Sequence, residues 1–248
     1  MTTILITGAN RGIGRGIADI FLSRPNTTLV ALVRDPSDET TTSLKPLSKD
    51  TKVIVLPYNA NDDHSAQAAV SSLHTEHNIT ALDIVIVNAG GMSWQGPSIE
   101  ASPETMLSHF HINTIGPLQL FKATLPLLQA SKNQPTKFFT ISSGVGSTEL
   151  VPKRKHLNVL PYGASKAAVN HVMRKLHTDH PDIVVELLAP GHVATDLTRS
   201  LRVEGQVIPA AAVSLKDSVK GLVRQIDMAN LETTNGGFKT WKGEVVPW

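Results

Sequence analysis

Apolar residues follow two different spacings along this chain. Short runs rich in Ile, Val and Leu recur, and longer segments between them repeat apolar residues at helical intervals. The runs predict buried strands, and the longer segments predict amphipathic helices. The expected strands are residues 3–7, 28–33, 53–56, 83–87, 137–141 and 183–188. The expected helices are residues 12–23, 65–76, 103–131, 162–178 and 214–228.

Strands and helices alternate over the whole length, which is typical of a parallel sheet covered by helices on both faces. We therefore expect an α/β fold, a doubly wound parallel sheet of the Rossmann type. No linker divides the chain, so residues 1–248 should form a single domain. Residues 192–213 lack strong periodicity and lie between a strand and a helix, so we expect them to form a mobile substrate loop.

The composition is that of an ordinary globular protein. Hydrophobic residues make up 41% and charged residues 18% of the chain, and the net charge is +2, so nothing indicates a nucleic-acid partner. The chain has no cysteine and no His-Glu-x-x-His pattern, so we expect neither disulfides nor a metal site. No apolar run is long enough to span a membrane, and a strand begins at once, so we expect a cytoplasmic protein.

A glycine-rich segment joins the first expected strand to the first expected helix. Its spacing is Gly-x-x-x-Gly-x-Gly, and it stands where a dinucleotide-binding βαβ unit turns. Glycines there allow a tight turn and close approach of the backbone to a pyrophosphate, while the helix N-terminus offers free N–H groups. The alternative is a purely structural turn. The candidate cofactor-binding residues are Gly8, Asn10, Arg11, Gly12, Ile13 and Gly14.

The end of the second strand bears on the choice of cofactor. Arg34 follows this strand about 20 residues after the glycine turn, where NAD binders tend to carry an acidic residue and where an arginine can pair with a 2′-phosphate. Arg34, helped by Arg11, therefore favours NADP(H). Asp35 leaves an alternative open, because it is either a ribose-binding acid or a turn residue before Pro36.

Tyr162 and Lys166 are four positions apart in an expected helix and so share one of its faces. A nearby cation lowers the pKa of a phenol, which makes Tyr162 a candidate general acid or base. Lowering that pKa by about three units takes roughly 4 kcal/mol, more than one cation usually supplies, so a second positive charge is needed. An oxidised nicotinamide would provide it. The alternative is an ordinary amphipathic surface.

Together, the glycine turn and the Tyr-Lys pair resemble the short-chain dehydrogenase/reductase family, and further family motifs follow in order. Asn88-Ala89-Gly90 ends the fourth strand, Asn113 lies in the long helix, Ser143 ends the fifth strand, and residues 190–195 follow the sixth. The resemblance covers essentially the whole chain and implies NADP-binding contacts at further positions. These are Asn59, Asn88, Ala89, Gly90, Tyr162, Lys166, Pro190, Gly191, Val193 and Thr195.

The resemblance also implies catalytic roles. Tyr162 would donate a proton, Ser143 would hold the substrate carbonyl, Lys166 would lower the pKa of Tyr162 and bind ribose hydroxyls, and Asn113 would hold a water in a proton relay. Taken singly, Ser143 could merely end a strand and Asn113 could cap a kink before Gly116-Pro117.

The chain departs from the commoner family pattern in two places. Residues 149–156 lengthen the segment before Tyr162 and should form a protruding loop near the site. The basic run Lys153-Arg154-Lys155 within it is too short for a nucleic-acid interface and fits an exposed loop. Asn59 stands where an aspartate that contacts adenine is common, and it keeps an acceptor but no charge.

Within the family the chain looks like a carbonyl-reductase-like branch, and in particular like fungal ketoreductases related to norsolorinic acid ketoreductase. This implies an NADPH-dependent reduction of a small-molecule ketone or aldehyde, with a place in secondary metabolism. An alcohol dehydrogenase working oxidatively and a catalytically idle cofactor-binding sensor are the alternatives. Met92 and Trp94 could line the substrate pocket or belong to the core or to an interface, and a homo-oligomer is possible.

Overall fold

The computed structural model describes residues 1–195, 197, 213–234 and 236–248. Its described strands form one parallel sheet of seven, in the order β3-β2-β1-β4-β5-β6-β7. Their bounds are β1 Thr2–Thr7, β2 Thr27–Val33, β3 Lys52–Pro57, β4 Ile84–Val87, β5 Lys137–Ile141, β6 Val184–Ala189 and β7 Phe238–Thr240. The order reverses between β1 and β4, which is the doubly wound arrangement that the sequence predicts.

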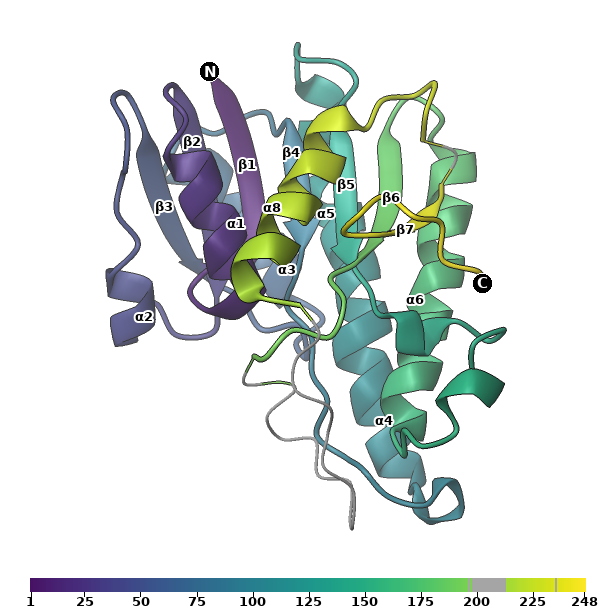
Figure 1. Ribbon diagram of the computed structural model, residues 1–248. Helices are drawn as coiled ribbons and strands as arrows, with labels where there is room; N and C mark the ends of the chain where they lie inside the picture. The colour runs from purple at the N-terminus through teal and green to yellow at the C-terminus, as the bar shows by residue number, and fades with distance from the viewer. Residues whose placement is uncertain (196, 198–212, 235) are drawn as a thin grey trace.

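Helices cover both faces of the sheet. Helices α1 and α8 lie side by side on the near face in Figure 1, and α3, α5 and α6 cover the far face. The bounds are α1 Gly12–Leu22, α2 Glu39–Thr42, α3 Ser65–Thr75, α4 Pro103–Phe110, α5 Gly116–Ala130, α6 Leu160–Asp179 and α8 Leu215–Met228. This layering buries the strands on both sides, as their continuous apolar runs predict.

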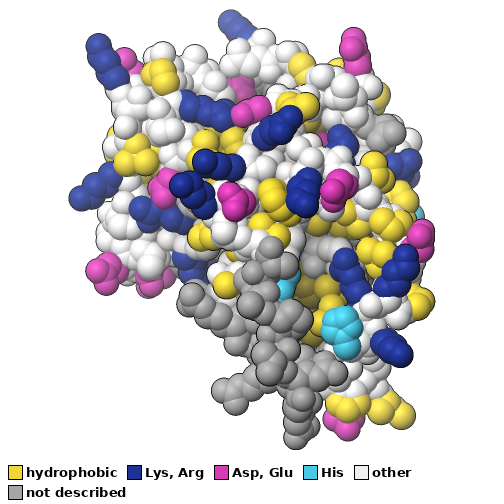
Figure 2. Space-filling model, viewed as in Figure 1, with side chains coloured by type: hydrophobic (Ala, Val, Ile, Leu, Met, Phe, Trp, Pro, Cys, Tyr) yellow, Lys and Arg dark blue, Asp and Glu magenta, His cyan; other side chains and the backbone are white. Residues whose placement is uncertain are grey.

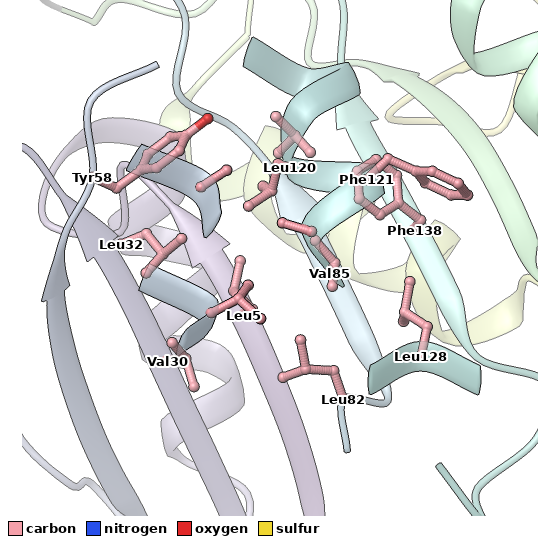
Figure 3. Packing of buried hydrophobic residues seen from close by; sticks show 14 of the residues in the cluster. Leu5, Val30, Leu32, Tyr58, Leu82, Val85, Leu120, Phe121, Leu128 and Phe138 are labelled. Atoms are coloured by element: carbon pink, nitrogen blue, oxygen red, sulfur yellow. The ribbon is translucent and has the colours of Figure 1, made fainter. Parts of the chain in front are cut away.

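Each face of the sheet has its own hydrophobic core. On the α5 and α6 side, Phe121 packs edge-on against Phe138 with ring centroids 4.9 Å apart. Figure 3 shows side chains of β1, β2, β4 and β5 meeting those of α5 in this core. On the other side, Phe21 of α1 and Leu222 of α8 are buried against the sheet. The two cores hold the strand ends in place, and the candidate site lies at those ends.

The long helix predicted over residues 103–131 is present but changes its winding. Helix α4 passes into a π-turn at His111–Ile115 (η2), which continues directly into α5. A π-turn inserts a residue into the helical ladder and often accompanies a functional site. Asn113 lies within this turn, and its side chain is fully buried.

Several other elements differ from expectation. The short strand β7, whose Phe238 pairs with Leu187, and the one-turn helix α2 were not predicted from the sequence. Short 3-10 turns occur at Ser98–Glu100 (η1), Gly144–Gly146 (η3) and Pro152–Arg154 (η4). Most of the expected substrate loop at 192–213, namely residues 196 and 198–212, lies outside the described residues.

The described helices, and the acidic and histidine side chains of the described residues, bear on membrane and metal binding. None of the described helices combines the length and the apolar character that crossing a membrane requires. Over the same residues, no three acidic or histidine side chains are grouped in a way that could hold a metal ion.

Candidate active site

A cavity of about 1020 Å³ opens at the carboxyl ends of the central strands. This is the edge at which open parallel sheets bind ligands, and the cavity lies where the strand order reverses. Most of the predicted site residues line it: Gly8, Asn10, Arg11, Gly12, Ile13, Arg34, Asn59, Asn88, Ala89, Gly90, Tyr162, Lys166, Pro190 and Thr195.

The other predicted residues lie next to the cavity without lining it. Ser143 and Asn113 each contact a residue of the site. Gly191 has a φ of +80°, and a Cβ there would lie 3.0 Å from Val213 and 3.1 Å from Trp241. Val193 is buried and bridges to Val213. Gly191 and Val193 therefore hold the start of the segment after β6 against the chain that precedes α8.

The glycine turn is held by backbone contacts that leave no room for side chains. A Cβ on Gly14 would lie 2.2 Å from the Gly8 carbonyl oxygen and 2.5 Å from Asn88 Nδ2. Asn88 Nδ2 donates hydrogen bonds to the carbonyls of Thr7 at 3.1 Å and Gly8 at 3.2 Å. The Asn88 side chain therefore connects the end of β4 to the glycine turn by hydrogen bonds.

The start of α1 is shaped for an anionic ligand. Gly8 and Gly12 have φ values of +64° and +56°, in the region that favours glycine. The N-cap residue of α1, Arg11, makes no side-chain capping hydrogen bond, so its side chain leaves the first N–H groups of the helix available. These groups and the helix dipole suit a phosphate.

The Asp35 carboxylate makes local contacts in the turn that follows β2. One carboxylate oxygen of Asp35 accepts hydrogen bonds from Ser37 N at 2.8 Å and Ser37 Oγ at 2.6 Å. These bonds hold the pKa of Asp35 below its usual value. Asp35 is therefore engaged in the turn around Pro36, and both Asp35 and the neighbouring Arg34 are exposed and line the cavity.

Two residues at this end of the cavity, Asp38 and Thr40, were not predicted from the sequence. Asp38 caps the short helix α2 by accepting from Thr40 N at 2.8 Å, and Asn10 Nδ2 donates to Thr40 Oγ1 at 2.8 Å. Asp38 also lies close enough to Arg11 for the cation to help lower the pKa of the carboxylate. An acidic residue followed by Glu and three threonines is a recognisable helix start and could have revealed this contact.

Tyr162 and Lys166 lie together in the first turns of α6, as their spacing predicts. Lys166 Nζ is 5.7 Å from the centroid of the Tyr162 ring and donates a hydrogen bond of 2.9 Å to the carbonyl of Ile141. The two side chains are almost completely buried, with 8% of Tyr162 and 5% of Lys166 exposed. This burial removes the alternative that the pair belongs to a solvated helix surface.

Burial dominates the electrostatics of this pair. It raises the pKa of Tyr162 to about 12, against the opposing effect of a hydrogen bond with Ser143. It also lowers the pKa of Lys166 to about 8. The protein's own groups therefore favour a neutral phenol, whereas the expectation from Lys166 alone was a lowered phenol pKa. The physical reason is that desolvation of the phenolate exceeds the attraction of one cation.

Ser143 reaches Tyr162 because η3 packs tightly on α6. Ser143 caps η3, with its Oγ accepting from Val145 N at 3.2 Å. A Cβ on Gly146 would lie 2.7 Å from the backbone of Lys166, so only a glycine allows this approach. The Ser143 and Tyr162 side chains are joined by a hydrogen bond, which places two hydroxyls at one point of the site.

Asn113 lies directly behind Lys166. Its Oδ1 accepts from Gly91 N at 3.0 Å, and its Nδ2 donates to Gly91 O at 2.8 Å and to Ser165 Oγ at 3.0 Å. A Cβ on Gly90 would meet Asn113 Oδ1 at 2.9 Å and Lys166 Nζ at 3.6 Å. The Asn113 amide thus ties the segment after β4 to α6, and its role in a proton relay stays a prediction.

The opposite end of the cavity is lined by residues that sequence reasoning did not assign: Ser93, Ser108, His109 and Ile112. His109 is buried, its Nε2 accepts from Ser93 N at 3.2 Å, and its Nδ1 lies 2.8 Å from the carbonyl of Thr105. We assign the proton to Nδ1, because a carbonyl can only accept. Of the two ambiguous residues, Met92 lines the cavity and Trp94 packs against Gly96.

Comparisons with known proteins agree with this geometry. The family model for short chain dehydrogenase matches residues 2–205. The norsolorinic acid ketoreductase of Aspergillus parasiticus is 36% identical over 250 residues, which cover 100% of this chain and 91% of that protein. A norsolorinic acid ketoreductase of Dothistroma septosporum is 32% identical, covering 100% and 92% of the two chains.

Solved structures include a carbonyl reductase from chicken fatty liver with NADPH bound, which is 27% identical and superposes with a TM-score of 0.86. That match covers 100% of this chain and 99% of the carbonyl reductase. The matched family model spans the glycine turn, Asn113, Ser143, Tyr162 and Lys166. The sequence match and the arrangement of these residues lead to one conclusion: the chain belongs to the short-chain dehydrogenase/reductase family of oxidoreductases.

Proposed function

We propose that this protein is an NADPH-dependent carbonyl reductase that converts a small ketone or aldehyde to an alcohol. The observation that carries the proposal is the buried pair of Tyr162 and Lys166, with the half-buried Ser143 next to Tyr162, beside a cavity that begins at a glycine turn. Reduction of a carbonyl builds negative charge on its oxygen, which needs a proton donor and a hydrogen-bond partner. Two hydroxyls joined at one point supply both.

The residues present fit a dinucleotide. Gly12, which lines the cavity with a positive φ, and the start of α1 suit a pyrophosphate, and Arg34 suits a 2′-phosphate. When bound, NADPH supplies the hydride and leaves a positively charged ring after transfer. Tyr162, held neutral by burial, is poised to give its proton, and Ser143 to hold the carbonyl oxygen. Lys166 would bind ribose hydroxyls and steady the phenolate.

Relatives support the substrate class. The norsolorinic acid ketoreductases and the carbonyl reductase named above are proteins whose names specify reduction of a carbonyl. We extend that activity to this chain and propose a role in secondary metabolism, with no nucleic acid, metal or membrane involved in the reaction. An alcohol dehydrogenase that prefers NAD is the second candidate, but Asp35, its candidate ribose acid, is engaged by Ser37.

The test is consumption of NADPH with a panel of aromatic and aliphatic ketones, followed by absorbance. Tyr162→Phe should lower kcat by about 10²–10⁴-fold, because the general acid is lost. The matched control is Tyr58→Phe, since Tyr58 is the other of the two tyrosines, is also buried, and has its hydroxyl 3.5 Å from the Gly116 carbonyl. It should retain most of the activity.

Three results would contradict the proposal. Absence of turnover with any carbonyl would favour an idle cofactor-binding protein. Oxidation of alcohols with NAD at a higher efficiency than any reduction with NADPH would favour the second candidate. Equal losses in Tyr162→Phe and Tyr58→Phe would remove Tyr162 from its role as proton donor.

A further inference from the structure

The loop over residues 149–156 brings an arginine to the catalytic serine. Arg154 ends the 3-10 turn η4, and its guanidinium lies over the backbone of Gly144. A Cβ added to Gly144 would be 2.5 Å from Arg154 Nη1 and 2.6 Å from Nη2. Gly144 directly follows Ser143, whose side chain is hydrogen-bonded to Tyr162. The cation therefore stands one residue away from the pair that faces the substrate carbonyl.

This guanidinium is half-buried and has no acidic partner in the part of the chain that the structure describes. Burial alone lowers the pKa of Arg154, and no carboxylate contributes to it. Other arginines within the described residues form ion pairs, among them Arg15 with Asp19 and Arg24 with Asp227. An arginine stays charged in proteins, so its partial loss of water is an uncompensated cost.

The loop has an exposed glutamate, Glu149, at its start, but positive charges directly flank Arg154. Lys153 and Lys155 flank it and are exposed. Figure 2 shows dark blue lysine and arginine side chains beside a hollow with yellow hydrophobic walls, in the lower right part of the molecule where Figure 1 places this loop. A positive rim on a hollow raises the local concentration of anions.

Resting on the proposed function, we propose that Arg154 is a specificity-determining residue that binds an acidic oxygen, a carboxylate or a phenolate, carried by the carbonyl substrate. A guanidinium offers a planar fork of N–H donors that matches such oxygens. Its place beside Ser143 sets the acidic group on the same side of the substrate as the carbonyl that is reduced. Arg34 has a different place from Arg154. Arg34 lines the cavity together with Asp35 and Asp38, whereas Arg154 lies beside Ser143 without lining that cavity.

A matched pair of ketones tests this assignment. One is para-acetylbenzoate and the other its methyl ester, which has the same ring and ketone without the charge. In wild type the acid should have the higher kcat/KM, and in Arg154→Met the ratio of acid to ester should fall about tenfold or more, as expected for a lost charged hydrogen bond. Arg154→Lys, which keeps the charge without the fork, should lie between them.

Two control variants distinguish recognition of the acidic group by Arg154 from a general effect of positive charge and from a structural effect. Lys153→Met removes an exposed charge one position away and should change the ratio less than about twofold, because exposed charges are screened. Gly144→Ala adds a Cβ where the guanidinium lies, and should lower the ratio although Arg154 is kept. A para-hydroxyacetophenone arm, run above and below the ionisation of its phenol, distinguishes a phenolate ligand from a carboxylate.

The outcomes are distinguishable from failure of the proposed function. Turnover of the methyl ester reports the reductase activity itself, and parallel losses for acid and ester in Arg154→Met would show a structural role and overturn the assignment. An unchanged ratio would also overturn it. The proposed function fails only if no carbonyl of the panel is reduced. If neither para-acetylbenzoate nor its ester is turned over, calorimetric binding of para-acetylbenzoate to wild type and to Arg154→Met decides on Arg154: equal affinity overturns the assignment, and loss of binding supports it.

Discussion

Two lysines, the buried Lys166 of α6 and the half-buried Lys239 of β7, have opposite surroundings. At the active site, Lys166 has 5% of its surface exposed, contacts the Ile141 carbonyl, and has its pKa lowered to about 8 by burial. Between β6 and β7, Lys239 Nζ lies 2.6 Å from Glu186 Oε1, and the Glu186 side chain is 1% exposed. Lys166 donates to a carbonyl oxygen, and Lys239 pairs with a buried carboxylate.

The two cations differ in how the protein compensates their charge. Burial raises the pKa of Glu186, and Lys239 and Lys137 oppose that rise, so the charges in this region compensate one another. Lys166 has no such compensation from the described protein and destabilises the fold unless a ligand interacts with it. Ionisable groups with strongly shifted pKa values tend to mark functional sites for this reason. Ion pairing inside a sheet needs no functional explanation.

The largest expected effect comes from removing the uncompensated charge. Lys166→Met should lower kcat/KM about 10²-fold or more, because the group that steadies the phenolate is lost. It should also stabilise the protein at pH 7. A shift from 10.5 to about 8 corresponds to about 3 kcal/mol, from which the hydrogen bond to Ile141 subtracts about 1 kcal/mol. Kinetics and thermal unfolding measure the two effects, and a less stable variant would contradict the comparison.

An exposed cation on the same cavity should affect binding without affecting stability. Arg34→Ala should raise KM for NADPH about tenfold and leave KM for NADH unchanged, because a charged hydrogen bond to a 2′-phosphate is removed. Steady-state kinetics with both cofactors measures this. Arg24→Ala is the control, since Arg24 pairs with Asp227 at 2.8 Å away from the cavity. An unchanged cofactor preference in Arg34→Ala would refute the NADP argument.

The paired region should tolerate loss of both charges. The double variant Glu186→Leu, Lys239→Met should match or exceed the wild type in stability by up to about 2 kcal/mol, because buried ion pairs seldom outperform apolar packing. Its kcat should be unchanged. Glu186→Leu alone should be less stable than the double variant, since it leaves two lysines without their carboxylate. Chemical denaturation provides the measurement, and lost activity in the double variant would make this region functional.

The smallest expected effect is a pH dependence of the free energy of unfolding that is lost when Lys166 is replaced. The pKa of Lys166 is lower in the folded protein than in the unfolded chain, so between pH 8 and 10.5 the unfolded state binds more protons. Stability due to this group therefore rises with pH through that window. The stability advantage of Lys166→Met should be full below pH 8 and should shrink toward pH 10.5. An advantage that does not change with pH would mean that the pKa is not lowered.

Local pattern accounts for the parts of this protein that were predicted correctly. The apolar runs predicted the alternation of strands and helices and hence a parallel sheet, and the spacing of Tyr162 and Lys166 predicted a shared helix face. Both features depend on residues that are near one another in the sequence. Strand β7 was missed, since its three residues form a strand only by pairing with β6. The π-turn around Asn113 was missed for a similar reason: its place depends on contacts with Gly91 and Ser165.

The sequence by itself determined the type of site, namely a glycine turn before a helix and a phenol, a lysine, a serine and an asparagine at spacings that match one family. Only the tertiary structure decided the charge states of Tyr162 and Lys166 and the side chains that surround the site. Burial raises the pKa of Tyr162 and lowers that of Lys166, which no spacing can show. The approach of Arg154 to Gly144 likewise depends on how a loop folds back. Desolvation and long-range packing are sums over the whole fold, whereas motifs are properties of a short stretch of chain.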